Sequence, residues 1–383
     1  MKIVILGTAY PYRGGLAAFN ERLAREFAVE GHEVEIVTFS LQYPDFLFPG
    51  KTQYSTDPAP ADLRIRRGMN SVNPFSWFRI GRMISRMQPD LLVIKFWIPL
   101  MAPCLGTIAR MVRRNGKTKV VSILDNVLPH EKRPLDRLLV RYFVGSVDRF
   151  VAMSDSVLND LRLFTRTKPA ALCPHPLYDH FGERIASDQA KAKLGIAADK
   201  TVLLFFGFIR DYKGLDWLLK AYADPRIDKD KVRLVVAGEF YNNSQTYFDL
   251  EQQLHLKGLI DWHTDFIPDG EVARYFSAAD LVVQPYKSAT QSGVTQIAYH
   301  FEKPMLVTRV GGLAEIVPDG KAGYVTEPNA EAVADALADF CNGTAPQRFE
   351  QGIKEEKQKY AWSRMTAAVI GSDNHPITNT EKQ

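Results

Sequence analysis

The sequence has few cysteines, little excess charge and no long apolar run. Its 383 residues include only three cysteines, Cys104, Cys173 and Cys341, whose spacing fits neither a zinc site nor a disulfide framework. This scarcity predicts a reducing compartment, the cytoplasm. A formal net charge of only +4 indicates no nucleic-acid partner. No stretch reaches the roughly 20 apolar residues of a membrane span, and residues 1–11 lack the features of a signal peptide.

Short apolar runs are present instead, and they alternate with helical patterns. Each run has the length and composition of a buried parallel strand. In the first half of the chain they lie at 2–7, 34–39, 91–96, 119–124 and 149–154. In the second half they lie at 201–207, 232–238, 280–286, 304–309 and 322–326. This alternation predicts an α/β protein of two doubly wound, Rossmann-like domains.

The two predicted domains meet near LCPHPLYDHFG at 172–182, which is rich in turn-forming residues. We therefore expect a first domain at 1–180 and a second at 181–359. The polar tail at 373–383 is predicted to be disordered. Because parallel sheets bind ligands beyond the C-terminal ends of their strands, we expect the site in a cleft between the domains.

The stretch FFGFIRDYKG at 205–214 places two cations after a predicted strand. Arg210 and Lys213 follow the strand end at Gly207 and precede a helical pattern. Such cations can neutralise a diphosphate leaving group, which is electrostatic stabilisation of the charge that develops. The alternative is two solvated loop residues. Their place at a strand end favours the first interpretation.

A second stretch, SATQSGVTQIAYHFEKP at 288–304, also follows a predicted strand. Its N–H groups at the helix start are expected to bind the same diphosphate. The residues expected to contribute are Gln291, Ser292, Gly293, Val294 and Thr295. The alternative is a capped helix that buries Ile297 and Phe301, and both interpretations can hold together.

The first strand ends in GTAYPYRGG at 7–15, which is not the G-x-G-x-x-G fingerprint of dinucleotide binding. Gly14 and Gly15 stand where a helix begins, so their N–H groups are expected to face a phosphate or a sugar oxygen. A plain tight turn is the alternative.

Further polar groups follow other strands. Four of them cluster after the run at 119–124, and we expect at least one to be functional: Asp125, Asn126, His130 and Glu131. Glu239 ends another strand, where its carboxylate can bind sugar hydroxyls. Glu315 can do the same, or either can pair with Arg210 or Lys213.

The segments 73–88 and 95–117 combine aromatic residues with arginines. This mixture fits peripheral contact with an anionic membrane surface. A core-facing helix with solvated cations is the alternative.

These motifs together resemble family 4 glycosyltransferases of the GT-B architecture, over almost the whole chain. The resemblance rests on the GG loop, GFIRDYKG, HPLYDHFG, AADLVVQPY, SGVTQIAYHFEKP and GGLAEIVPDGKAG. It implies retaining transfer of a sugar from a nucleotide-sugar donor to a hydroxyl of a glycan or lipid-linked acceptor, with no metal or other cofactor. It also implies cell-surface polysaccharide or glycolipid synthesis at the inner membrane face. A last helix at 360–372 is expected to cross back to the first domain.

The resemblance also assigns roles to residues. Arg210, Lys213, Asp125 and His130 take catalytic positions, with Asp125 where the family usually has histidine. Asn126 and Glu131 lie on the acceptor side. The donor nucleotide and sugar are expected at Gly207, Glu239, Phe240, Phe266 and Ile267.

Two departures from the family pattern stand out. Phe208 replaces the usual first arginine, and the two glutamates separated by seven residues are absent. Their aligned positions hold Ala289 and Ile297. The nearest replacements are Gln291, Ser292, Thr295 and Gln296. A non-catalytic assembly subunit and a nucleotide-sugar epimerase or hydrolase of the same fold therefore stay open as alternatives.

Overall fold

The computed structural model describes residues 1–43, 53–55, 58–128, 134–241, 244–289, 292–343 and 345–372. The chain divides into two compact units. The first comprises Met1–His175 and the chain from Trp362 onward, and the second comprises Pro176–Ala361. The tail predicted at 373–383 lies outside the described residues.

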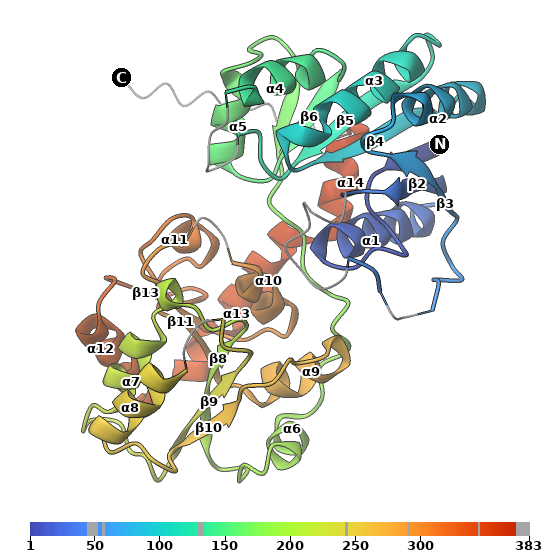
Figure 1. Ribbon diagram of the computed structural model, residues 1–383. Helices are drawn as coiled ribbons and strands as arrows, with labels where there is room; N and C mark the ends of the chain where they lie inside the picture. Colours follow the sequence, from blue (N-terminus) through green and yellow to red (C-terminus); the bar gives the residue numbers. More distant parts are fainter. Residues whose placement is uncertain are drawn as a thin grey trace. The chain divides into compact units, whose positions relative to one another are not determined.

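The described part of the first unit is built on a seven-stranded parallel sheet with the order β3-β2-β1-β4-β5-β6-β7 (Figure 1). Its strands are β1 (Lys2–Leu6), β2 (Glu33–Leu41), β3 (Ile65–Asn70), β4 (Leu91–Phe96), β5 (Lys119–Leu124), β6 (Arg149–Ala152) and β7 (Ala170–Leu172). β1 pairs with both β2 and β4, so the strand order reverses there. Such a reversal leaves room for a ligand beyond the C-terminal strand ends.

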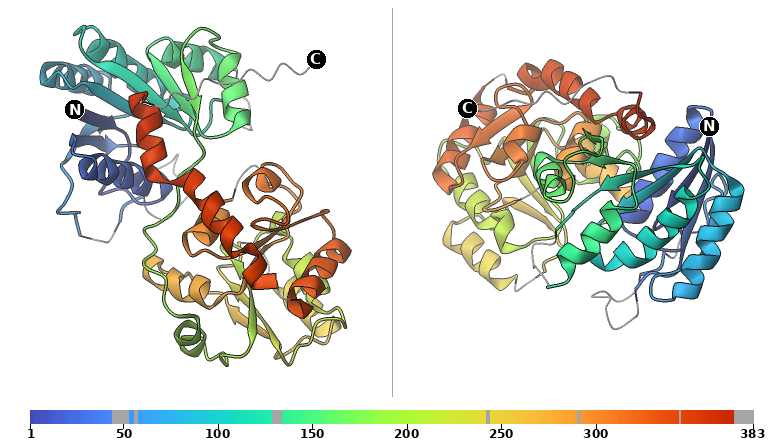
Figure 2. Two further views of the ribbon diagram at one scale, coloured as in Figure 1. Left: turned by 180° about the vertical axis from the view of Figure 1, so that it is seen from behind. Right: turned by 90° about the horizontal axis from the view of Figure 1, so that it is seen from above.

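Helices cover both faces of this sheet. They are α1 (Gly15–Val29), α2 (Pro74–Met87), α3 (Ala102–Arg113), α4 (Asp136–Val144), α5 (Asp155–Arg162) and α14 (Trp362–Ile370), with the short η2 (Pro99–Met101) before α3. Because side chains alternate along a strand, Ile3 and Ile5 pack under α1 and α14, whereas Val4 and Leu6 pack with α2 to α5. Figure 2 shows α14 lying along the first-unit sheet, where it contacts α1, β5 and β6.

The second unit repeats the architecture with six strands among its described residues, in the order β10-β9-β8-β11-β12-β13. The strands are β8 (Thr201–Phe206), β9 (Val232–Ala237), β10 (Ile260–His263), β11 (Leu281–Gln284), β12 (Met305–Thr308) and β13 (Gly323–Thr326). β8 pairs with β9 and β11, so the order reverses at β8. The C-terminal end of β8 is therefore the expected ligand edge of this unit.

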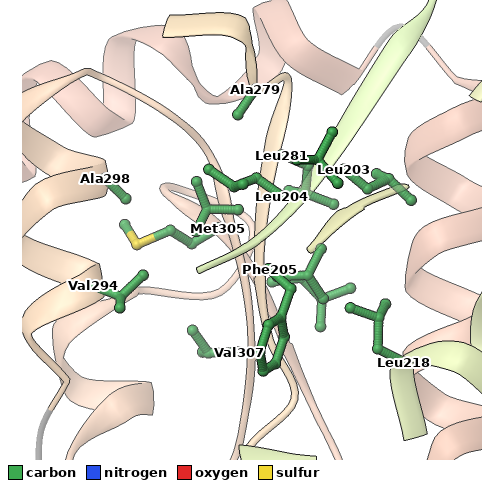
Figure 3. Packing of buried hydrophobic residues seen from close by; sticks show 14 of the residues in the cluster. Leu203, Leu204, Phe205, Leu218, Ala279, Leu281, Val294, Ala298, Met305 and Val307 are labelled. Atoms are coloured by element: carbon green, nitrogen blue, oxygen red, sulfur yellow. The ribbon is translucent and has the colours of Figure 1, made fainter. Parts of the chain in front are cut away.

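The helices of the second unit pack on both faces of its sheet. They are α6 (Ser187–Lys193), η3 (Asp211–Lys213), α7 (Leu215–Tyr222), α8 (Gln245–Gln253), α9 (Asp269–Ala278), α10 (Gly293–His300), α11 (Leu313–Ile316), α12 (Ala330–Asn342), α13 (Ala345–Lys357) and η4 (Gln358–Tyr360). Figure 3 shows how Leu218 of α7 and Val294 of α10 approach the strand residues Phe205 and Val307. This packing fixes the loops at the strand ends.

The two parallel sheets confirm the predicted fold class, and every predicted apolar run contains a strand. The sequence missed β3, β7 and β10. All three are edge strands and are short or polar, so they lack the continuous apolar run of a central strand.

Two further features of the structure concern the cysteines and the length of the helices. Cys104 and Cys173 are buried and Cys341 is partly buried, and none of the three is in a disulfide. Of the helices described, none is both long enough and apolar enough to cross a membrane.

Candidate functional site

The loop after β8 carries both predicted cations. Lys213 is only 9% exposed, although lysine side chains are rarely buried without a partner. Its pKa is lowered to about 8, first because burial disfavours the charged form and second because the Arg210 guanidinium is near. No carboxylate in the described part of the chain forms an ion pair with Lys213.

Arg210 is also without an acidic partner among the residues described. Its guanidinium carbon lies 3.8 Å from the centre of the exposed Tyr241 ring. The pairing of Glu239 or Glu315 with Arg210 or Lys213, left open by the sequence, does not occur between these described side chains. Both cations are therefore available to an anionic ligand.

The cation loop is held against the loop that follows β11. Gly214 has φ of 68°, and a Cβ there would lie 1.9 Å from the carbonyl oxygen of Pro285, so glycine is required. The Lys287 ammonium lies 2.9 Å from an Asp211 carboxylate oxygen and 3.0 Å from one of Asp216. These contacts fix the backbone from which Arg210 and Lys213 project.

A buried polar network lies beneath the start of α10. Ser292 caps this helix, because its Oγ accepts the N–H of Val294 at 3.2 Å. The same hydroxyl donates to Gln284 Oε1 at 2.7 Å and lies 3.3 Å from the Tyr286 hydroxyl. Gln284 Nε2 is buried and has no hydrogen-bond partner within the described ranges. The network orients the helix start and leaves one buried donor unused.

The start of α10 and Lys213 converge on Gly207. A Cβ at Gly207 would lie 3.0 Å from Lys213 Nζ and 3.8 Å from Val294 Cγ2. The first N–H groups of an α-helix have no partner inside the helix, and at the start of α10 the Ser292 hydroxyl accepts one of them, the Val294 N–H. An ammonium group beside free N–H groups at a helix start favours a bound anion.

The positions aligned with the two missing glutamates hold apolar side chains. Ala289 packs against the core, and Ile297 is part of it. Among the proposed replacements, Gln291 lies outside the described residues, and the Thr295 hydroxyl donates to the Ser292 carbonyl at 2.5 Å. Gln296 is buried, and its Oε1 has no partner in the described part of the chain. The capped-helix interpretation is thus correct for this helix, and Ser292 caps it.

The predicted nucleotide-side residues differ in their surroundings. Phe240 packs against Tyr247 and Trp262, which gives it a structural role in this unit. Phe266 is exposed, and Ile267 packs partly against the core. Only Phe266 of the predicted aromatic pair therefore offers an open ring.

The first unit presents an open helix start at Gly14 and Gly15. Gly14 has φ of 96°, no side chain caps α1, and its first turn contains no acidic residue. A Cβ at either glycine would meet nothing within 4 Å. The turn therefore both requires glycine at position 14 and leaves backbone N–H groups accessible.

Asp125 follows β5 directly, as the sequence predicted. Its side chain is 19% exposed, and Oδ1 lies 2.8 Å from Lys95 Nζ. Asn126 is exposed, and His130 and Glu131 lie outside the described residues. The structure thus places one carboxylate and one amide at this strand end.

Sequence reasoning missed Lys95. This residue is the fifth of six in β4 and is 2% exposed, and its Nζ lies 3.2 Å from the centre of the Phe19 ring. Burial lowers the pKa of its ammonium, and the Asp125 carboxylate opposes that shift. A single lysine inside the apolar run LLVIKF was the available signal.

Each unit thus has polar groups at the C-terminal edge of its sheet. The second unit offers unpaired cations and a helix start, which suit a phosphate-containing ligand. The first offers an oriented carboxylate, which accepts hydrogen bonds from hydroxyls. Across the described ranges, no three His, Cys, Asp or Glu side chains gather as ligands for a metal.

Family comparison identifies the class of protein. Residues 186–358 match the family described as "Glycosyl transferases group 1", and residues 13–174 match "Glycosyltransferase Family 4". The chain belongs to the family 4 glycosyltransferases, and its two parallel sheets form the GT-B fold.

Two curated relatives and one solved structure illustrate the similarity. The chain is 31% identical over 245 residues to a D-inositol 3-phosphate glycosyltransferase of Saccharomonospora viridis, covering 59% of this chain and 55% of that relative. It therefore spans about half the length of that protein. It is 24% identical over 344 residues to the N-acetyl-alpha-D-glucosaminyl L-malate synthase of Bacillus anthracis, covering 85% and 84%. The crystal structure of Anabaena Alr3699/HepE in complex with UDP has a TM-score of 0.68 at 16% identity and covers 97% of this chain and 100% of that one.

Proposed function

We propose that the protein transfers a glycosyl group from a nucleoside diphosphate sugar to a hydroxyl with retention of configuration. The observation that carries this proposal is the buried Lys213, which has no acidic partner among the described residues and lies beside the start of α10. An unpaired buried ammonium is costly unless a ligand supplies the opposite charge. A diphosphate supplies that charge.

The transfer breaks the bond between the sugar C1 and the diphosphate oxygen. Arg210, Lys213 and the N–H groups of α10 stabilise the charge that develops on the leaving diphosphate. The acceptor hydroxyl attacks C1 from the same face, and its proton passes to the departing phosphate oxygen. Arg210 and Lys213 thus neutralise the diphosphate charge without a metal ion, so we expect chelators to leave the transfer rate unchanged.

The first unit supplies the acceptor side in this proposal, with Asp125 and Asn126 at its strand edge. Two relatives are named for inositol 3-phosphate and for malate, which are both hydroxyl compounds. We place the acceptor of this protein among glycans or lipid-linked carriers used for cell-surface polysaccharide or glycolipid synthesis. The surface of α2 supports this choice.

The exposed face of α2 is both aromatic and cationic. Phe75 is 85% exposed and Phe78 is 55% exposed, which is a large exposure for aromatic side chains of one helix. They border a groove of about 870 Å³ that also contains Arg66, Arg67, Arg79, Arg82 and Arg86 and has no acidic lining residue. Exposed rings beside arginines suit an anionic bilayer surface. We propose that this face contacts the cytoplasmic membrane peripherally.

Vesicle sedimentation tests the membrane proposal. The protein is expected to sediment with phosphatidylglycerol vesicles and not with pure phosphatidylcholine vesicles. Replacing Phe75 and Phe78 together with serine should abolish sedimentation. Leu138→Ser, at an exposed apolar residue of α4, is the control and should leave it intact. If the variant without Phe75 and Phe78 sediments with phosphatidylglycerol vesicles as well as the Leu138→Ser control does, α2 is not the membrane contact.

Thermal unfolding in the presence of nucleotides tests the transferase proposal. A ligand that binds only the native state raises the melting temperature. We expect one nucleoside diphosphate series to do so, with UDP as the first probe, and Lys213→Met to lose the shift. Lys303→Met is the control, because Lys303 is another buried lysine with a pKa lowered to about 8, at the opposite edge of the sheet. No shift with any nucleotide would remove the proposal.

Product analysis separates the alternatives. Nucleoside diphosphate released faster with an acceptor present supports transfer. Release at the same rate without an acceptor indicates a hydrolase, and a changed sugar in the recovered nucleotide sugar indicates an epimerase. Nucleotide binding without any turnover indicates a non-catalytic assembly subunit.

A further inference from the structure

The interior of the first unit contains an ion pair at the ligand edge of its sheet. Lys95 of β4 and Asp125 after β5 are neighbours because the two strands pair in parallel register. Their charged atoms are 2.8 Å apart, and Lys95 is 2% exposed whereas the Asp125 side chain is 19% exposed. The pair therefore runs from the interior toward the surface, with the carboxylate outermost.

The ammonium is enclosed on its other side by α1. Its Nζ lies over the Phe19 ring, and Phe19 in turn packs against Trp362 of α14. Phe19 follows Gly15 by four residues, so Lys95 lies about one helical turn below the open start of α1. This packing, together with an exposure of only 2%, restricts the movement of the Lys95 side chain.

Fold stability alone gives a weak reason for a lysine at this position. The other residues of β4 are apolar and buried. Replacing a buried ion pair with apolar residues of similar volume is often neutral or stabilising. A buried pair at the edge where parallel sheets bind ligands is more simply explained by a role for its outer member.

The Asp125 carboxylate has one oxygen in use. Oδ1 is buried against Lys95, and the backbone N–H of Asp125 donates to the Phe96 carbonyl at 2.9 Å. Oδ2 has no partner within the described ranges. The backbone hydrogen bond and the ion pair at Oδ1 together restrict the positions that Oδ2 can take.

We propose that Lys95 is the positioning residue of the acceptor-side site: it holds the Asp125 carboxylate so that Oδ2 accepts a hydrogen bond from a substrate hydroxyl. This inference rests on the glycosyl transfer proposed above. Lys95 also balances the charge of Asp125, so that an anionic nucleotide sugar meets a neutral pair. The hydroxyl belongs either to the donor sugar or to the attacking acceptor.

A double-mutant cycle tests this role. The variants are Lys95→Met, Asp125→Asn and the two combined, with Lys95→Arg as the conservative replacement. Lys168→Met is the matched control: Lys168 is a partly buried lysine of the first unit whose ammonium donates to the Val144 carbonyl at 2.7 Å and makes no contact with Asp125. The reaction is diphosphate release from the nucleotide sugar that gives the largest thermal shift, with water as the acceptor.

We expect Lys95→Met to lower kcat/KM about tenfold or more, and Lys95→Arg to restore part of the loss. Because Lys95 acts through Asp125, adding Lys95→Met to Asp125→Asn should change the rate less than about twofold. Lys168→Met should remain within about twofold of the parent. The inference would be overturned if the losses in kcat/KM of the two single variants multiplied in the double variant. It would also be overturned if Lys95→Met kept the kcat/KM of the Lys168→Met control.

The affinity ratio between the nucleotide sugar and the bare diphosphate identifies the hydroxyl. A ratio that falls in Lys95→Met indicates a hydroxyl of the donor sugar, and an unchanged ratio with a slower rate indicates the attacking hydroxyl. If Lys95→Met does not fold, the comparison of Asp125→Asn with the combined variant still tests the role of Lys95. Equal rates for these two variants are expected, and unequal rates contradict the role. A parent protein that binds no nucleotide would refute the transferase proposal itself, whereas normal turnover by Lys95→Met refutes only this inference.

Discussion

Each unit has a buried lysine where the strand order of its sheet reverses, but only one of the two has an acidic partner. Lys95 in the first unit lies 2.8 Å from the Asp125 carboxylate. Lys213 in the second has no such partner among the residues described, and the nearby Arg210 adds a second positive charge. Burial lowers the pKa of both lysines, and the neighbouring charge then acts in opposite directions.

This difference separates two uses of a buried cation. We propose that a lysine neutralised within the protein, such as Lys95, orients its acidic partner, and that the partner binds the ligand. A lysine that is left unneutralised requires the charge of the ligand itself. In our proposal, the same fold, repeated in one chain, provides a hydroxyl-binding edge in one unit and an anion-binding edge in the other.

Removing the backbone support of the unpaired cations should have the largest effect. Gly214→Ala forces a Cβ to within 1.9 Å of the Pro285 carbonyl oxygen at a φ of 68°. We expect the free energy of unfolding of the second unit to fall by about 3 kcal/mol, and nucleotide binding to weaken with it. Urea unfolding measures the change.

Gly270→Ala is the control for this prediction. Gly270 lies in the first turn of α9, and a Cβ there would meet nothing within 4 Å. It should leave the unfolding midpoint nearly unchanged. Equal unfolding midpoints for the two variants would show that the backbone around Gly214 and Pro285 can shift to accommodate a Cβ with little loss of unfolding free energy.

The pH dependence of nucleotide binding sharpens the contrast between the two lysines. With a pKa of about 8, Lys213 carries its charge below that pH and loses it above. UDP affinity should therefore fall as pH rises through about 8, by up to tenfold per pH unit. Titration calorimetry from pH 6.5 to 10 measures this fall in UDP affinity. The Lys213→Met variant should bind UDP weakly, with an affinity that does not change with pH over this range. A parent affinity that is flat over this range would contradict the assignment.

The stability of the ligand-free protein should change with the opposite sign. The folded-state pKa of Lys213 lies below its unfolded value of about 10.4, so the unfolded chain binds more protons between these limits. The unfolding free energy contributed by this group therefore rises with pH across that window. Lys213→Met should remove this gain and leave the similar contribution of Lys303.

The sequence predicted the parts of the site that are local to one strand end. Arg210 and Lys213 follow β8 directly, and Ser292 stands just before α10, so the apolar runs and helix signals were sufficient to place them. The polar network escaped prediction because it depends on tertiary packing. Gln284 ends an apolar run, and nothing in its neighbours indicates that its side chain would accept a hydrogen bond from the Ser292 hydroxyl.

Lys95 escaped for a related reason. Its partner Asp125 directly follows the neighbouring strand β5, and only the register of β4 and β5 brings the two together. The pattern of apolar runs predicts that strands exist but not which residues lie side by side. A lone charge inside an apolar run is nevertheless a usable signal, because burial requires that charge to find a partner.

The helix caps of the two units give the smallest but most selective test. Ser292 caps α10 in the second unit, and Ser154 caps α5 in the first, where its side chain accepts the Val157 N–H at 3.3 Å. Replacing either serine with alanine should lower stability by about 1 kcal/mol, because each removes one cap hydrogen bond. Only Ser292→Ala should weaken UDP binding, by a few fold, since the Ser292 hydroxyl also donates to Gln284 beneath the helix start that we propose binds the diphosphate. Unfolding and calorimetry on the two variants decide the matter, and a UDP affinity unchanged in both would mean that α10 contributes no anion contact and that the cations act alone.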